Sequence, residues 1–202
     1  MTRLANELRA VTHLARLGYS LQACSLVAGL YEIALTIVYI GTDNQRATTW
    51  LDHMDPLKSP WSVGDLTKEA VAKLGGEPQY ADSLYRVYSQ FCMVKHGHPQ
   101  VEIQQVTRLA PNEIELADGP SFTERSQRSA WFGLVHGTRL ALMTQGQYTL
   151  DHVPVEGQRV LLDRRADLDA IAARLNQQAV SRWPDSTGDP FPGRWKQFTG
   201  PK

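Results

Sequence analysis

The sequence contains few of the features that mark a secreted or membrane protein. It has only two cysteines in 202 residues, Cys24 and Cys92, and both lie in apolar stretches. Two distant cysteines of this kind indicate buried thiols in a reducing compartment rather than a disulfide. The first nine residues alternate charged and apolar side chains, so we expect no secretory signal and a cytoplasmic location.

An excess of charge of either sign is also missing. The 21 lysines and arginines equal the 21 aspartates and glutamates, so net charge does not predict a nucleic-acid-binding protein, and contact with RNA would need a local patch. The sequence has no glycine-rich phosphate loop, nucleophile elbow or pair of catalytic carboxylates. These absences disfavour the common nucleotide enzymes, and we expect no cofactor.

Long apolar runs are limited to one, from Ala23 to Ile40. Its length is close to the minimum for a membrane span. The run contains Glu32, however, and a carboxylate in the middle of a bilayer is costly. No second run of this length occurs, so we expect the core helix of a bundle and no association with a membrane.

Apolar residues at helical spacing dominate the rest of the chain. Side chains suited to N-capping occur at Asp43, in Ser62–Asp65 and in Ser121–Glu124. Gly146 would end the long helix that begins at the last of these, followed by an extended stretch over 148–162. The expected helices are about 3–17, 21–40, 44–53, 62–74, 78–95, 121–144 and 164–182.

These elements predict an all-α bundle with 21–40 and 80–95 as its inner pair. Residues 1–183 would form a single helical domain. Partial alternation over 101–116 predicts a short β-hairpin inserted into it, and 184–202 is an irregular tail rich in proline, glycine and aromatic residues.

One segment has the composition of a site: Lys95-His96-Gly97-His98, at the exit of the 78–95 helix. A histidine can move a proton and a lysine can stabilise negative charge. The alternative is a capped helix end, where His96 interacts with the last carbonyls and the helix dipole. A metal site would need further ligands, and no cysteine or carboxylate cluster is near in sequence, so we expect none. Glu32 needs a partner, for which Lys95, Arg86 or a backbone group is suitable.

Several short motifs together resemble a known family. They are Ser25-Leu-Val-Ala-Gly-Leu-Tyr-Glu32 with the apolar run after it, Arg46-Ala-Thr-Thr-Trp50-Leu, Tyr88-Ser89, and Lys95-His96 ahead of Pro99. This pattern resembles bacterial helical proteins grouped with the higher-eukaryote-and-prokaryote-nucleotide-binding (HEPN) superfamily. The resemblance covers roughly 14–99. It departs from the family where relatives carry an arginine early in the second helix and this chain has Ala28 or Gly29.

The resemblance implies a HEPN-like, metal-independent ribonuclease in a prokaryotic stress or phage-defence system of the toxin–antitoxin type. RNA, an antidote or effector protein and a second copy in a homodimer would be its partners. His96, Lys95, His98 and Glu32 would be catalytic, and Arg86, Arg128 and Ser89 would bind substrate. The superfamily's usual spacing of arginine four to six residues before histidine is absent, because Arg86 precedes His96 by about 15 Å of helix rise.

A second hypothesis from another class stays open. The chain would then be a non-catalytic helical module of the same fold that binds a partner protein through its apolar faces or through the aromatic tail. The absence of an arginine four to six residues before a histidine favours this hypothesis. The Lys-His-x-His segment at the end of the 78–95 helix favours the ribonuclease. Trp50 and Trp61 flank a proline-containing loop, and they would line a pocket or pack in the core.

Overall fold

The computed structural model describes residues 1–55, 58–98, 106–110, 113–116 and 119–183. Over these residues the fold is all-α, with seven helices and one pair of strands. The elements are α1 Thr2–Arg16, α2 Ser20–Ile40, α3 Asn44–Leu51, α4 Val63–Lys73, α5 Pro78–Lys95, β1 Val106–Ala110, β2 Glu113–Leu116, α7 Glu124–His152 and α8 Val155–Arg182.

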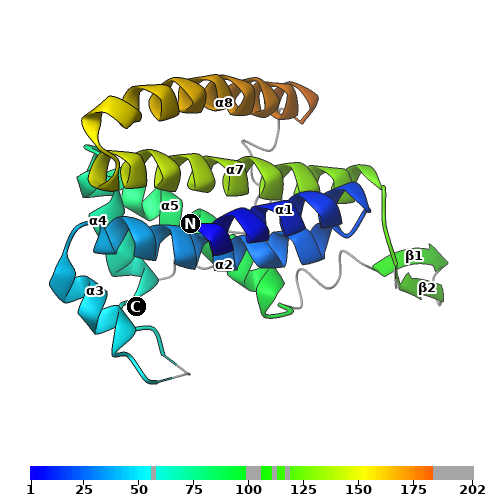
Figure 1. The fold of residues 1–202 in the computed structure, drawn as a ribbon. Helices are drawn as coiled ribbons and strands as arrows, with labels where there is room; N and C mark the ends of the chain where they lie inside the picture. Colours follow the sequence, from blue (N-terminus) through cyan, green and yellow to red (C-terminus); the bar gives the residue numbers. More distant parts are fainter. Residues whose placement is uncertain (56–57, 99–105, 111–112, 117–118, 184–202) are drawn as a thin grey trace.

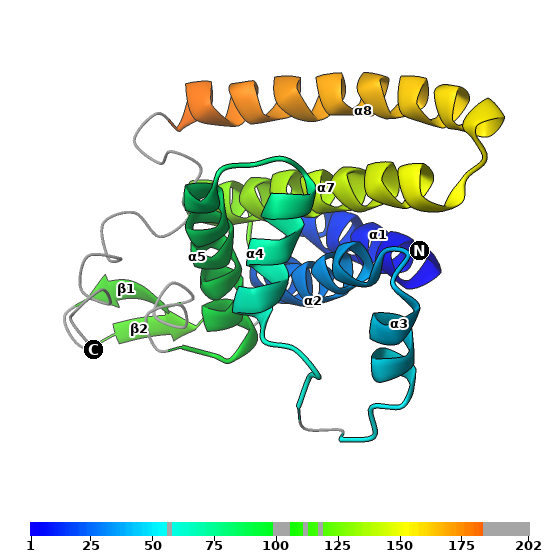
Figure 2. The same cartoon turned by 90° about the vertical axis from the view of Figure 1, so that its left-hand side faces the viewer.

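The helices stack in layers (Figure 1). α8 lies over α7, and α7 lies over the pair formed by α1 and α2. α4 and α5 run across the direction of α7 and α8, and α3 projects from the end of α2 (Figure 2). Gly133 and Gly137 bring α7 close to its neighbours, since a Cβ at either position would come within 3.3 Å of side-chain atoms of α1 or α2.

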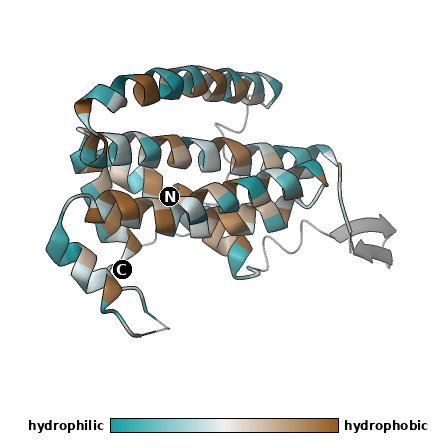
Figure 3. Cartoon of the chain, in the orientation of Figure 1, coloured by the Kyte–Doolittle hydropathy of each residue, from teal (hydrophilic) through white to brown (hydrophobic). Residues whose placement is uncertain are grey.

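α2 is the central helix of the bundle, as the sequence predicts. It contacts α1, α3, α4, α5 and α7, because a helix that is apolar nearly all round must be covered on most sides. The helix has the length and hydropathy of a membrane span, but 56% of its most apolar window is buried inside the bundle. α8 instead alternates apolar and polar residues along its length (Figure 3) and contacts α7.

The expected inner pair of helices is only partly right. α2 does pack against α5, but its most extensive contact is with α7. α7 is buried on several sides, because it lies between α2 and α8 and also touches α1. The partner of the central helix is therefore a helix much further along the chain.

Two helix starts that the sequence predicts are confirmed. The carboxylate of Asp43 accepts a hydrogen bond from the backbone N–H of Arg46 at 3.0 Å, and Ser62 Oγ accepts one from Asp65 N–H at 3.1 Å. Both satisfy backbone donors that have no partner within the first turn of a helix.

The expected start of the long helix at Ser121 is wrong by two residues. Thr123 is the N-cap of α7, and its Oγ1 accepts from Ser126 N–H at 3.2 Å. Ser121 is held outside the helix, because its own N–H donates to the carbonyl of Gly18 in the turn between α1 and α2.

Gly146 does not end α7, and the expected extended stretch over 148–162 is helical. The long helix continues to His152, so α8 begins at Val155 rather than near residue 164. Gly146 is buried inside α7, where a side chain would collide with the guanidinium of Arg165 on α8. This glycine therefore makes room for helix packing instead of capping a helix. The break comes at Pro154, with extended backbone at Val153 before it.

The strands β1 and β2 pair antiparallel, with Val106 opposite Leu116 and an irregularity between Arg108 and Ala110. They extend to one side of the helical layers (Figure 2). Residues 101–105 and 111–112 of the predicted hairpin lie outside the described residues, as does the whole tail at 184–202.

Candidate functional site

A large cavity lies along one side of α2. It has a volume of about 820 Å³, which is within the range of small-molecule pockets. Its lining comes from the start of α1, from α2, from the end of α3, from residues 58–62, from the start of α4 and from Tyr88 on α5. Walls from this many directions make it a concave site rather than a flat surface.

The floor of this cavity is an apolar stripe of α2. Gly29, Ile33, Ile37 and Ile40 line it, and their spacing of four, four and three residues places them on one face of the helix. All four are partly exposed, although α2 is otherwise the most buried helix. A Cβ built at Gly29 would have no atom within 4 Å. The cavity therefore reaches down to the backbone of α2 at this position.

Aromatic rings form one wall. Trp50 and Trp61 are nearly parallel, with ring centroids 6.1 Å apart, and Trp61 packs on Tyr39 at 4.8 Å. The guanidinium of Arg46 lies 4.0 Å from the centre of the Tyr39 ring and also pairs with Glu69 at 2.9 Å. Trp50 is still 43% exposed. Trp50 and Trp61 therefore give the cavity an aromatic wall that is open to solvent.

The polar end of the cavity is Glu32, which meets Tyr88 and Lys95 from α5. Glu32 Oε1 accepts hydrogen bonds from Tyr88 Oη at 3.0 Å and from Lys95 Nζ at 3.1 Å. Of the partners expected for Glu32, Lys95 is confirmed. Burial raises the pKa of Tyr88, and its bonds to Cys92 and to the Glu32 carboxylate add to this effect. Tyr88 therefore acts here as a neutral hydrogen-bond donor.

The Lys95–His98 segment has a structural role at the end of α5. His96 is the C-cap residue, Gly97 has φ +61°, and the N–H groups of Gly97 and His98 donate to the carbonyls of Val94 and Met93. These two hydrogen bonds form a Schellman motif, which needs a residue that adopts positive φ easily. The same motif ends α1 at Gly18 and α4 at Gly75. The backbone of His96-Gly97-His98 thus supports the interpretation as a capped helix end.

The remaining predicted site residues do not join Glu32 and Lys95. Ser89 on α5 donates its hydroxyl to the carbonyl of Tyr85 in its own helix. Arg86 is exposed about three turns before His96 on the same helix. Arg128 lies on α7 and lines a separate cavity of about 30 Å³ between α7 and α8. Within the described residues, the structure brings Glu32 and Lys95 of the expected site into contact.

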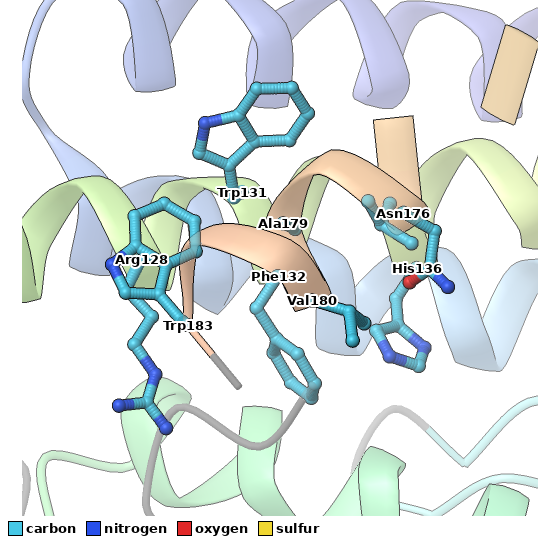
Figure 4. A pocket seen from close by; sticks show the side chains of 9 residues that line it. Arg128, Trp131, Phe132, His136, Asn176, Ala179, Val180 and Trp183 are labelled. Atoms are coloured by element: carbon cyan, nitrogen blue, oxygen red, sulfur yellow. The ribbon is translucent and has the colours of Figure 1, made fainter. Parts of the chain in front are cut away.

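The small cavity also shows a buried histidine that sequence reasoning did not select. Figure 4 shows Arg128 and His136 on opposite sides of the Phe132 ring. His136 Nδ1 shares a hydrogen bond of 3.2 Å with the Tyr31 hydroxyl, and the tautomer decides which atom donates. Burial, assisted by the charge of Arg139, lowers the pKa of His136 to about 4. This histidine is therefore neutral at physiological pH.

The thiols differ from expectation in one respect. Cys24 is buried and donates its Sγ–H to the carbonyl of Ser129 at 3.2 Å, and burial raises its pKa to about 12. Cys92 is only partly buried, although the sequence predicts two buried thiols. Within the described ranges the cysteines are free and no group of three or more metal-ligating side chains comes together.

The arrangement along α2 can bind an apolar molecule and hydrogen-bond it at one end. The floor and the tryptophan wall supply apolar area, and Glu32 Oε2 accepts no hydrogen bond from the described part of the chain. Tyr88, Trp50 and Trp61 belong to this site. Of these three, only the two tryptophans, which flank a loop, suggested a pocket from the sequence.

No family model matches this chain, and neither curated proteins nor solved structures include a significant match.

Proposed function

We propose that this chain is a non-catalytic helical binding module whose cavity along α2, the α2 cavity, takes up an apolar ligand. The single observation that carries the proposal is a cavity of about 820 Å³ that leaves an apolar stripe of the central helix, Gly29, Ile33, Ile37 and Ile40, partly exposed. Apolar surface of this kind in a concave site is stabilised when a ligand removes it from water.

The charged residues beside the α2 cavity also favour binding over catalysis. Glu32 and Lys95 neutralise each other at 3.1 Å, so the lysine is already engaged and is less able to hold a phosphate. Their side chains are 40% and 37% exposed, so this ion pair contributes little to stability. It is therefore better understood as part of a polar rim than as a structural bridge.

Filling the α2 cavity from its floor tests the proposal. The substitution Gly29→Leu adds a side chain where no atom lies within 4 Å, and it replaces glycine by a strong helix former. We expect the thermal midpoint to stay level or rise. Binding of the uncharged fluorescent probe N-phenylnaphthylamine, followed by its emission and by quenching of tryptophan fluorescence, should weaken at least about tenfold.

The matched control is Gln22→Leu, which adds the same side chain at an exposed position of the same helix outside the α2 cavity. This variant should bind the probe as the wild type does. Wild-type protein that does not bind the probe, or Gly29→Leu protein that binds it equally well, would contradict the proposed function.

Metal-independent cleavage of RNA is the second function that we propose, supported by the exposed Lys95, which contacts Glu32, and by the exposed His96 that follows Lys95 in the chain. The ribonuclease would be a homodimer regulated by an antidote protein. Under this function, the purified chain cuts RNA in EDTA, and His96→Ala abolishes cutting without shifting the thermal midpoint. His13→Ala, at an exposed histidine on α1, is the matched control. RNA that stays intact with the wild-type chain rejects this function.

A further inference from the structure

The lining of the α2 cavity has more positively charged than negatively charged side chains. Arg3 on α1, Lys58 between α3 and α4, and Glu32 on α2 all line it. Glu32 is already paired with Lys95. Arg3 and Lys58 therefore remain as positive charges without a compensating carboxylate in the lining.

Arg3 pairs only loosely with a carboxylate of its own helix. Arg3 Nε is 3.9 Å from Glu7 Oε1, and the arginine side chain is 75% exposed, so this pair is weak. The Lys58 segment is held by its backbone instead, because the Lys58 carbonyl bonds to the His53 ring at 2.6 Å. Lys58 is thus positioned by its main chain while its side chain is solvent-exposed.

We propose that the ligand of the α2 cavity is an amphipathic anion, meaning an apolar body with a single negative head group such as a carboxylate. The inference rests on the proposed binding function. The apolar body would lie on Ile33 and Ile37 beside the tryptophan wall, and the head group would pair with Lys58 or Arg3. A charge-assisted hydrogen bond to either cation is stronger than one between neutral groups.

A cationic amphiphile fits the same cavity less well. Its head group would be repelled by Arg3 and Lys58, and Lys95 already offsets the charge of the Glu32 carboxylate. A neutral amphiphile would keep the apolar contact but lose the ion pair. The charge of the head group should therefore rank ligands that share one apolar chain.

A competition series on the full chain tests this ranking. Dodecanoate, dodecanol and dodecylammonium, each below its micelle concentration, are used to displace N-phenylnaphthylamine from the wild type and from two variants. We expect dodecanoate to bind about fivefold more tightly than dodecanol, and dodecylammonium to bind most weakly. Lys58→Gln combined with Arg3→Gln should remove the preference for dodecanoate and leave dodecanol unchanged.

The matched control is Lys68→Gln combined with Arg9→Gln, because these exposed cations on α4 and α1 do not line the α2 cavity. This variant should keep the preference. Displacement that is equal for the three amphiphiles, or strongest for dodecylammonium, overturns the inference while the binding function stands. If the probe itself does not bind to the wild type, the proposed function fails instead, and with it the inference.

Discussion

Phe91→Ala is expected to lower the free energy of unfolding by about 3–5 kcal/mol. Phe91 is 1% exposed on α5. Its ring stacks on Phe132 of α7 at 5.0 Å and lies 5.9 Å from Tyr31 of α2. Truncation would leave a cavity at the junction of three helices. Domains of this size have a total stability of roughly 5–15 kcal/mol, so urea denaturation followed by circular dichroism should show a large loss.

Phe122→Ala serves as the matched control, because it deletes the same atoms from a side chain that is 61% exposed. Its cost should stay below about 1 kcal/mol. If both variants lost the same stability, the aromatic junction of α2, α5 and α7 would not be the part of the core that holds these helices together.

Local signals in the sequence predicted two helix starts, those of α3 and α4, and the central helix. Asp43 and Ser62 are capping residues in the structure, because a helix start needs an acceptor for its unpaired N–H groups and this need is local. The all-round apolar character of α2 likewise predicted its central position. Both features depend on residues that are near one another in the chain.

Features that depend on distant residues were not predictable. Gly146 has the signal of a helix end, but Arg165 of α8 lies against it, and only the packed structure shows that contact. The α2 cavity is similar, because α2 looks uniformly apolar in sequence. Which of its faces stays uncovered depends on where α3 and the 58–62 segment pass.

The two polar residues of the site differ in how visible they are in the sequence. Glu32 could be predicted because a carboxylate in an apolar helix is unusual, whereas Tyr88 was not predicted because a tyrosine on an apolar helix face is ordinary.

Acidification should destabilise the chain through His136. An unfolded histidine has a pKa of 6.5, whereas burial lowers the pKa of His136 to about 4 in the folded chain. Between these values the unfolded chain binds the proton and the folded chain does not, so stability falls as pH decreases from about 6.5 to about 4. A difference of this size corresponds to about 3 kcal/mol. The measurement is the free energy of unfolding in urea at several pH values.

His136→Gln should remove this part of the pH dependence, because glutamine can still hydrogen-bond Tyr31 but does not titrate. Other groups also titrate over this range, so the informative quantity is the difference between the wild type and the variant. His152→Gln is the matched control, as it removes an exposed histidine from the same helix. It should leave the pH dependence unchanged. Parallel pH profiles for the wild type and His136→Gln would mean that the imidazole between α7 and α8 accepts a proton without unfolding the bundle.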